Sequence, residues 1–472
     1  MKRDDYRREF AGFQFARAQA RQDGWRQSSP FEPLPARIHD RFSDLWSLTA
    51  VETLRGEREA DQSRPEVERR GGDVLRAVAE TWLIRAQCRE IETELHRALT
   101  APFIAWQGGR HAAVALAAQA ARETDPAQRR ALESKLAAHY AGLVDLREQR
   151  REVSAAATRR LGYASPAAQA AAHAQALMDE DLAPWMTACE RFLADTDADA
   201  PRAAALRSDP PADDPFEARL MRRAVEATLR NLGARPWQQA NVTTIWQATG
   251  AAGVFRARVP EDIRWAVTMQ PGWQAWQRLL GELARVQQAA WTSTKLPIEL
   301  RSHGDPALAE TWQRLFAGLL FDPHWTTSLL DIQPPPALRR AMAAARQRLA
   351  RRAALRCVAW HGRETAGWTL ERLRAEFEQR LGASLSDWEL LDELEAAPLA
   401  LARLRGDWLA AALDDWLRTR YGHWHVSRRA GDDLIDLWNT GFRYPAGRLA
   451  ALVGVGPIGP EAWLSELARL SR

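Results

Sequence analysis

Residues 273–291 read WQAWQRLLGELARVQQAAW and predict one long, Trp-rich helix. Gly281 and Arg285 are four positions apart, so they share one face of this helix, and Glu282 follows Gly281 directly. A second carboxylate, Glu310, comes 25 positions after Arg285 on a later helical segment. The centre of the chain therefore combines two carboxylates and one guanidinium at helical spacing.

Helical periodicity continues over nearly the whole sequence. Asp125 and Asp305 each precede a proline, a pairing typical of a helix start. Asp73 is also predicted as an N-cap, and residues 408–417 carry the apolar spacing of a late helix. No sustained alternation of period two is found, although a short strand is expected near residues 254–259. The sequence predicts an all-α fold with at most minor β structure.

The composition of the 472 residues is that of a folded soluble protein, with 46% hydrophobic and 27% charged residues. The formal net charge of +4 is small for this length, so a general polyanion-binding surface is not expected. The N-terminus has no apolar core behind its charges, and no run of about 18 apolar residues occurs. Three widely spaced cysteines argue against a disulfide framework. We expect a cytoplasmic protein without a membrane segment.

Composition also predicts the domain boundaries. Residues 194–215 are acidic and Pro-rich, and they predict a surface linker between an N-terminal helical lobe, residues 1–193, and a C-terminal lobe, residues 216–472. Residues 56–72 are highly charged and predict an exposed loop. A run of prolines at residues 333–336 predicts a further break.

Three stretches resemble one known family. Residues 143–193 contain Arg-rich helical sequence followed by Leu161-Gly-Tyr163, residues 273–325 contain the GELAR segment, and residues 361–450 are helical. Their order is similar to that of the thimet oligopeptidase and oligoendopeptidase F family of all-α zinc peptidases, and more distantly to angiotensin-converting enzyme and carboxypeptidase Taq. The resemblance implies a clamshell of two helical lobes around a central cleft.

Residue by residue, the resemblance assigns a metal site that lacks its ligands. Glu282 aligns with the family's general base and Glu310 with its carboxylate zinc ligand, whereas Gly281 and Arg285 occupy the two His positions of His-Glu-x-x-His. Zinc sites need at least three protein ligands, so we expect a degenerate member with no metal, no cofactor and no catalytic residue. Arg285 is expected to replace the zinc charge by pairing with Glu282 and Glu310.

Other residues of these stretches are candidates for lining the cleft. The aromatic candidates near the vestigial site are Trp273, Trp276, Trp291 and Trp312, although Trp at helical spacing is commonly core. Histidines that flank the Glu310 segment are His303 and His324. The family's late Tyr and His residues are not placed by the resemblance, and the residues in that region are Tyr421, His423 and Tyr444.

The predicted function is therefore that of a pseudopeptidase that binds a peptide or a partner protein in its cleft, for example an active peptidase relative. The alternative is an active hydrolase with a relocated zinc site, built from His303 or His324 with Glu310. The pair His423 and His425 could chelate a metal only in extended backbone and with a third ligand.

Three further motifs are interpreted as structural rather than functional. Cys357, His361 and Glu364 fit a partly buried helix better than a nucleophile or ligand set. Residues 454–459 match Gly-x-Gly-x-x-Gly without the strand and acidic residue of a dinucleotide site. The same turn resembles a helix-hairpin-helix, flanked by Arg448, which makes nucleic-acid binding a remote alternative and two helices joined by a Gly-rich turn the default.

Overall fold

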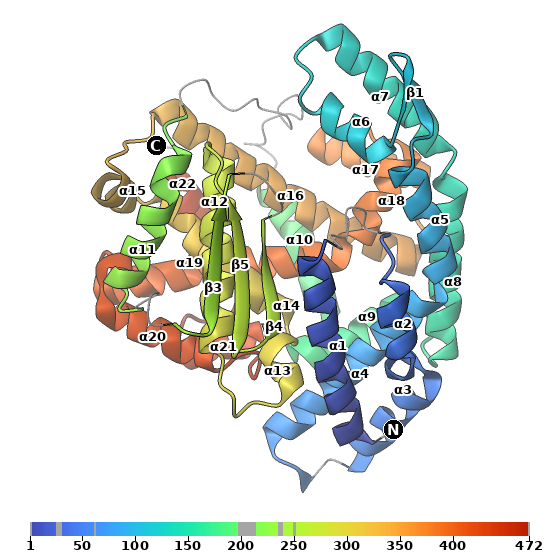
Figure 1. Cartoon of the computed structure of the whole chain (residues 1–472), viewed down its shortest axis with the longest axis horizontal. Helices are drawn as coiled ribbons and strands as arrows, with labels where there is room; N and C mark the ends of the chain where they lie inside the picture. The colour runs from blue at the N-terminus through green and yellow to red at the C-terminus, as the bar shows by residue number, and fades with distance from the viewer. Residues whose placement is uncertain are drawn as a thin grey trace. The chain divides into compact units, whose positions relative to one another are not determined.

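The computed structural model describes residues 2–24, 31–60, 63–196, 214–234, 239–248 and 252–470. Helices dominate this part of the chain, and strands form only a hairpin and one three-stranded sheet (Figure 1). The all-α prediction with minor β structure is confirmed. Most of the predicted linker, residues 197–213, lies outside the described residues.

The chain divides into two compact units, and each is built from separate stretches of sequence. Unit 1 comprises Met1–Ala60, Leu75–Ala172 and Ala359–Ala396, and unit 2 comprises Asp61–Val74, His173–Val358 and Ala397–Arg472. The chain passes from one unit to the other at five points, of which three lie inside the helices α4 (Glu66–Gln87), α9 (Pro166–Met178) and α16 (Pro336–Ala366). The units therefore do not follow the predicted boundaries at residues 193 and 216, and the predicted central cleft stays a prediction.

Unit 1 is helical apart from one short hairpin. Its remaining elements are α1 (Arg3–Gln22), α2 (Ala36–Arg41), η1 (Ser43–Trp46), α3 (Leu48–Ala60), α5 (Arg89–Thr100), β1 (Ile104–Trp106), β2 (Gly109–His111), α6 (Ala113–Ala120), α7 (Pro126–Ala141), α8 (Val144–Arg160), α17 (Leu370–Leu381) and α18 (Asp387–Glu395). Trp388 of α18 stacks on Tyr140 at 5.0 Å between ring centroids and meets Phe31 edge-on at 6.4 Å. This packing brings residues 359–396 into the unit.

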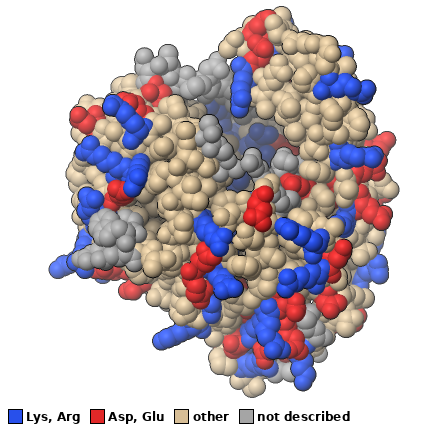
Figure 2. Space-filling model, in the orientation of Figure 1, with Lys and Arg blue, Asp and Glu red and all other residues tan. Residues whose placement is uncertain are grey.

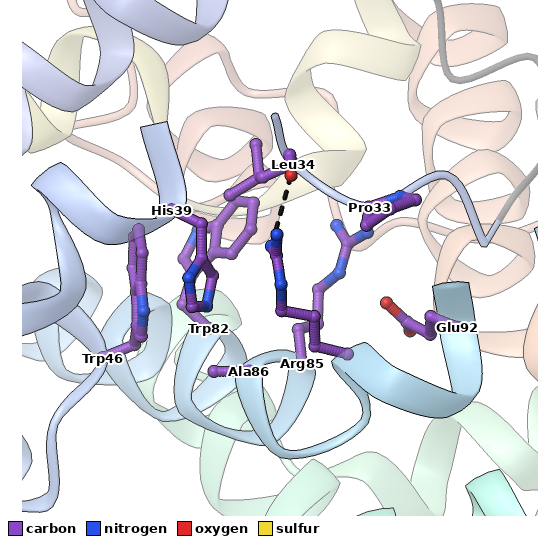
Figure 3. A pocket seen from close by; sticks show the side chains of 9 residues that line it. Pro33, Leu34, His39, Trp46, Trp82, Arg85, Ala86 and Glu92 are labelled. Atoms are coloured by element: carbon purple, nitrogen blue, oxygen red, sulfur yellow. Dashed lines mark hydrogen bonds between the residues drawn. The ribbon is translucent and has the colours of Figure 1, made fainter. Parts of the chain in front are cut away.

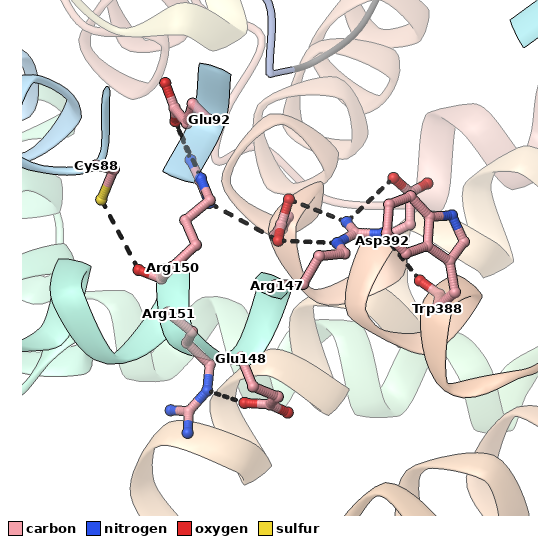
Figure 4. A network of polar contacts seen from close by, with 9 residues as sticks. Cys88, Glu92, Arg147, Glu148, Arg150, Arg151, Trp388 and Asp392 are labelled. Carbon is pink, nitrogen blue, oxygen red and sulfur yellow. Dashed lines mark hydrogen bonds and ion pairs between the residues drawn. The ribbon is translucent and has the colours of Figure 1, made fainter. Parts of the chain in front are cut away.

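A buried guanidinium joins α8 to α18 within unit 1 (Figure 4). Arg147 is 1% exposed, and its Nη1 donates to the carbonyl oxygen of Trp388 at 3.0 Å. Its Nη2 lies 3.0 Å from Glu395 Oε2, and the guanidinium lies 4.3 Å from the Trp388 ring centroid. Arg150, one turn later, pairs with Glu92 of α5 at 2.7 Å. Each buried charge thus has a partner, as burial requires.

Unit 2 holds the remaining elements. Its helices are α10 (Leu182–Asp195), η4 (Ala218–Leu220), α11 (Met221–Asn231), α12 (Trp273–Trp291), α13 (Ile298–Ser302), α14 (Pro306–Ala317), η6 (Gly318–Phe321), α15 (Pro323–Leu330), α19 (Ala397–Tyr421), η7 (Trp424–Val426), α20 (Arg428–Asn439), α21 (Ala446–Val453) and α22 (Glu461–Leu470). The most closely packed helices are α12, α14 and α19, with α14 in contact with both of the others. They form the centre of a large apolar core.

The sheet of unit 2 lies against α12 (Figure 1). It consists of β3 (Val242–Gln247), β4 (Gly253–Arg258) and β5 (Asp262–Thr268) in the order β3-β5-β4. The β3/β5 pair is parallel and the β4/β5 pair antiparallel. Residues 254–259 overlap β4, as predicted, but β5 was not predicted even though Ile263, Trp265 and Val267 alternate as buried residues along it.

The first residues of the helices can be compared with the N-caps predicted from the sequence. Asp125 and Asp305 each accept a hydrogen bond from the backbone two residues on, which confirms both N-caps. Asp73 is not an N-cap, because α4 begins seven residues earlier at Glu66. Pro65 and the acidic first turn of α4 favour that earlier start. The predicted loop at residues 56–72 is therefore wrong, since α3 and α4 occupy most of it. None of the described helices combines the length and apolarity needed to cross a bilayer.

Candidate functional site

Gly281 lies buried in the contact between α12 and α14. A Cβ atom built on Gly281 would be 2.5 Å from Cγ of Gln313, which is closer than carbon atoms approach in proteins. The side chain of Gln313 on α14 thus fills the volume that any larger residue at position 281 would need. An imidazole does not fit there in this packing.

Glu282 is held inside unit 2 by an aromatic donor. Its Oε2 accepts a hydrogen bond of 2.9 Å from Nε1 of Trp265 on β5. Burial raises the pKa of Glu282 above its ordinary value, and the Trp265 hydrogen bond and the charges of Arg278 and Arg285 oppose this shift only in part. Glu282 is therefore a half-buried carboxyl group that keeps its proton to a higher pH than a carboxyl group in water does.

The two arginines that pair with Glu310 lie on α14 and α19 rather than on α12. Its Oε2 lies 3.9 Å from Nη2 of Arg314 and 3.9 Å from Nε of Arg403. Arg314 in turn lies 3.3 Å from Oδ1 of Asp407. Among the described residues, Arg285 makes no ion pair with Glu310, so the prediction that Arg285 replaces the zinc charge for both carboxylates is wrong.

A close helix contact explains why Arg403 of α19 lies beside Glu310, whereas Arg314 is on α14 itself, four residues after Glu310. A Cβ atom on Gly406 of α19 would be 2.5 Å from Cβ of Glu310 and 3.0 Å from the carbonyl oxygen of Ala307. Only glycine lets α19 approach α14 this closely. The approach brings Arg403 of α19 to Glu310 and Asp407 of α19 to Arg314.

A second, fully buried network fixes the start of α14. Asp305 is 0% exposed, and its Oδ1 accepts from Nη1 of Arg405 at 2.8 Å and from the backbone of Ala307 at 3.0 Å. Its Oδ2 accepts from the backbone of Ala446 at the start of α21 at 3.0 Å. Arg405 also pairs with Glu180 at 3.2 Å. Asp305 thus fixes the start of the helix that carries Glu310 five residues later.

These residues do not fit a zinc ion at the α12/α14 contact. Gly281 offers no ligand atom, and Arg285 offers a cation where a ligand is needed. Only Glu310 supplies a ligand from the expected set, and its charge is already shared by two guanidinium groups. We therefore assign no metal and no metal-dependent step to this contact.

Three histidines converge elsewhere in unit 2. His324 is on α15, and His423 and His425 lie at and just after the left-handed turn at Gly422, where α19 ends. Nδ1 of His324 is 3.4 Å from Nε2 of His425, and the rings of His324 and His423 stack at 3.8 Å between centroids. One ligand atom from each of the three lies within 4.8 Å of the others.

This cluster differs from the relocated site that the sequence predicted. His324 belongs to it, but within the described part of the chain neither His303 nor Glu310 joins a group of three such ligands. His303 instead lies 2.8 Å through Nδ1 from Oγ of Ser302. His425 was considered only as the neighbour of His423, because a partner about 100 positions away leaves no signal in local spacing.

A buried carboxylate supports the histidine cluster. Oδ2 of Asp322 lies 3.5 Å from Nε2 of His425 and 3.1 Å from Nη2 of Arg418, while its Oδ1 caps α15 at the backbone of His324. The hydrogen bond with His425 and the charge of Arg418 hold the pKa of Asp322 well below its ordinary value, against the effect of burial. Burial and the neighbouring His423 and His425 lower the pKa of His324.

Most aromatic candidates for the cleft are core residues instead. Trp276 is 0% exposed and packs edge-on against Trp325 at 6.3 Å, and Trp312 is 1% exposed and packs edge-on against Trp438 at 6.3 Å. Trp273 is also buried. The assignment of these three to a cleft is corrected to the core, because the apolar face of α12 and α14 turns inward.

The remaining candidates are partly buried. Trp291 donates from Nε1 to Gln287 at 3.1 Å. Tyr421 donates to Asp433, and Tyr444 packs against the unit 2 core beneath the guanidinium of Arg443. Neither tyrosine belongs to the group formed by the three histidines.

The other motifs have the structures that their default interpretations predicted. Cys357 is 1% exposed on α16, and its thiol lies in the unit 2 interior with a raised pKa, beside Cys189. The Gly-rich turn joins α21 to α22, with Gly454 and Gly456 in left-handed backbone. Basic and acidic side chains are interspersed on the face shown in Figure 2.

Unit 1 has a small pocket of its own (Figure 3). Its wall carries the rings of Trp46 and Trp82 together with the guanidinium groups of Arg85 and Arg89. Arg89 donates to the carbonyl oxygen of Leu34 at 3.2 Å, and the guanidinium of Arg85 lies 5.0 Å from the Trp82 ring centroid. Both arginines of the pocket wall therefore already interact with groups of unit 1.

Comparison with known proteins places the fold. No protein-family model matches the chain, and no curated protein matches it. Among solved structures, an M32 carboxypeptidase from Deinococcus radiodurans R1 superimposes with a TM-score of 0.61 at 14% identity, over 99% of this chain and 98% of that one. Trypanosoma cruzi metallocarboxypeptidase 1 gives a TM-score of 0.59 at 12% identity, over 99% of each chain.

The predicted resemblance is confirmed at the level of the fold. An oligoendopeptidase F from Bacillus anthracis also superimposes, with a TM-score of 0.61 at 11% identity over 92% of this chain and 85% of that one. At such low identities the likeness concerns the path of the backbone and leaves the chemistry of each position to be read from this chain. The chain therefore has the fold of the all-α metallopeptidases that include the M32 carboxypeptidases and oligoendopeptidase F.

Proposed function

We propose that this chain is a non-catalytic peptide-binding protein built on the fold of a zinc peptidase. The observation that carries the proposal is the contact between Gly281 and Gln313, where no ligating side chain fits. Glu282 and Glu310 remain in the sequence, but Trp265 engages the first and Arg314 and Arg403 engage the second. The carboxylates then serve packing and charge balance in place of water activation.

A sheet edge offers the place for a peptide. Within the described residues β3 pairs on one side only, with β5. The carbonyl oxygens of Asn241 and Gln247 accept from β5, at Ile263 and Met269. Because backbone groups alternate sides along a strand, those of Thr244 point to the open edge. An extended peptide can add to such an edge as a further strand, with its main chain bound by hydrogen bonds.

The side chains along β3 suit this role. Thr243, Thr244 and Ile245 are exposed, and Ile245 is 47% exposed despite its apolar side chain. A β-branched, exposed edge favours strand addition, and Ile245 supplies an apolar contact for the bound peptide.

The absence of zinc-peptidase chemistry is tested with tag-free protein and a quenched fluorescent oligopeptide. We expect no cleavage that depends on added zinc, and no difference between the natural chain and Glu282→Gln. Cleavage that a chelator abolishes and that Glu282→Gln removes would overturn the non-catalytic assignment.

Peptide binding at β3 is tested by site-specific cross-linking. A benzophenone amino acid replaces Ile245 in the full chain, which is then irradiated with a tryptic digest of casein as a source of varied peptides. We expect peptide adducts at position 245 and few at Leu349, an apolar side chain that is 60% exposed on α16. Thr244→Pro removes an outward amide and should reduce the adducts. Equal capture at the two positions would contradict binding at this edge.

A further inference from the structure

We propose that His324, His423 and His425 form a binding site for one Zn²⁺ ion, separate from the α12/α14 contact. Three imidazoles are a common set of protein ligands for zinc, with a fourth position left for water. This zinc site is independent of the peptide binding proposed above. It is inferred from the geometry of the three histidine side chains.

The spacing of two ligand atoms already suits a tetrahedral ion. Two ligands at the usual Zn–N distance of about 2.0–2.1 Å lie roughly 3.3–3.4 Å apart in a tetrahedral site. Nδ1 of His324 and Nε2 of His425 are 3.4 Å apart. In the absence of an ion, these two nitrogen atoms face each other and can share only one proton. A zinc ion between them would bind the lone pairs of both.

The third histidine is placed where it can complete the set. His423 is exposed and follows Gly422, whose left-handed backbone ends α19 and turns the chain back toward α15. Its ring now stacks on His324, with its ligand atom within 4.8 Å of the others. A rotation of this exposed side chain loses little packing, and the solvent beside it gives the ion a route in.

The close approach of the three rings favours binding of a cation, because Nδ1 of His324 and Nε2 of His425 are 3.4 Å apart and the rings of His324 and His423 are stacked. Three imidazolium ions could not share this space, whereas three neutral imidazoles with one dication can. Zinc binding then satisfies nitrogen atoms that otherwise face one another.

A supporting carboxylate lowers the charge of the loaded site. Asp322 is 2% exposed, and its Oδ2 lies 3.5 Å from Nε2 of His425, the same nitrogen atom that faces His324. Arg418 holds Asp322 through a 3.1 Å ion pair. Asp414 binds the same Arg418 and accepts from Nε1 of Trp424, which lies between His423 and His425 in the sequence. Two carboxylates against one guanidinium leave a net negative charge beside the ion, and this charge attracts a dication.

The site is tested with full-length, tag-free protein that has been stripped with chelator and titrated with Zn²⁺ by calorimetry. We expect one ion per chain with a dissociation constant in the micromolar range or tighter. With Co²⁺ as a probe, the intense visible absorption of a tetrahedral complex should appear at the same stoichiometry.

Single substitutions locate the ion. His423→Ala changes an exposed side chain and should weaken zinc binding at least tenfold without unfolding the protein. Asp322→Asn keeps the cap of α15 and should weaken binding by about 10- to 100-fold through the loss of charge. His111→Ala, in the hairpin of unit 1, is the matched control and should bind zinc as the natural chain does.

The outcomes separate this site from the proposed function. No stoichiometric binding, or binding unchanged by His423→Ala, overturns the three-histidine site. Zinc that persists in His423→Ala and is lost in Glu310→Gln would contradict both proposals, because it would place the ion at the α12/α14 contact. Zinc lost with His423, together with an absence of peptidase activity, supports both.

Discussion

Any side chain at position 281 would collide with Gln313, because a Cβ atom there would lie 2.5 Å from Cγ of Gln313. We predict that Gly281→Ala destabilises unit 2 by about 1–3 kcal/mol, since overpacking forces strain on the surrounding side chains. Gly281→Ala with Gln313→Ala should recover most of this loss in a double-mutant cycle, measured by denaturant unfolding.

Gly318 provides the matched control for this substitution. It follows α14 in helical backbone, and a Cβ atom there would meet nothing within 4 Å. Gly318→Ala should therefore leave stability unchanged or raise it slightly. Equal losses at Gly281 and Gly318 would show that the contact with Gln313 is not tight in solution.

Glu282 gives a prediction with a definite pH dependence. Because burial raises its pKa in the folded state, Glu282 contributes stability that is fully present below its ordinary pKa and is lost as the pH rises through the folded value. The stability of Glu282→Gln relative to the natural chain should thus increase from acid to neutral pH, in urea unfolding at several pH values.

Glu217 serves as the control for Glu282, because its shift has the opposite sign. The hydrogen bond from Arg219 lowers the pKa of this exposed carboxyl. Glu217→Gln should show no gain with rising pH, and a gain as large as that of Glu282→Gln would indicate a general charge effect.

At the residue scale, the family resemblance proposed Gly281 and Arg285 as former ligand positions, but it did not indicate what these residues contact. Their assignment came from the resemblance to the zinc peptidases, and helical spacing only added that the two residues share one face. The partners of Glu310 were not predicted, since Arg403 reaches it from a helix about 90 positions later. The histidine cluster escaped prediction for the same reason.

Helix α14 depends on Asp305 more than its local sequence suggests. Asp305 caps the helix and also binds Arg405 and the start of α21, all in the interior of unit 2. We predict that Asp305→Ala costs about 3–5 kcal/mol, because it leaves Arg405 buried without its main partner. Asp305→Asn, which keeps the cap, should recover only the smaller share of the loss.

Asp125 is a natural control for Asp305 because it makes the same cap before a proline on α7. Its side chain accepts from the backbone of Ala127 at 2.9 Å, but the residue is exposed. Asp125→Ala should cost about 1 kcal/mol, the value typical of a lost N-cap. Both losses are measured by denaturant unfolding with a spectroscopic probe in the relevant unit, and similar values for the two variants would refute the role assigned to Arg405.

At the element scale, local chemistry was predicted well and long-range pairing poorly. The Asp-Pro starts of α7 and α14 follow from a carboxylate and a ring that act within one turn. Helix α4 was misplaced because Asp73, a good cap by residue type, lies inside a helix that Pro65 and Glu66 begin earlier. The strand β5 was missed although its alternation is regular, since it lies among Trp-rich sequence that also fits a helix.

Each compact unit is assembled from separated parts of the chain. Tyr140 and Arg147 contact Trp388, which lies more than 200 positions later. We predict that a fragment of residues 1–172 alone does not form a stable unit 1, because Arg147 then lacks its carboxylate partners. Co-expression with residues 359–396 should restore helical content and a cooperative thermal transition, measured by circular dichroism.

The outcome for the fragment also bears on the domain boundaries. A cooperative transition in residues 1–172 by themselves would favour the boundary predicted from the acidic stretch at residues 194–215. Composition identifies where a chain can be a linker, but it carries no information about which distant segment returns to complete a core. That is why fold class was predictable from periodicity while the make-up of the units was not.

The return of residues 359–396 to unit 1 sets an order for folding during synthesis. At about 5–20 residues per second, a ribosome needs roughly ten to forty-five seconds to proceed from residue 172 to residue 396. During that interval the apolar positions that will receive Trp388 have been made but have no partner. Transiently exposed apolar surface is in general what chaperones bind. We therefore expect synonymous codon changes between these two points to alter the yield of folded protein without altering its sequence.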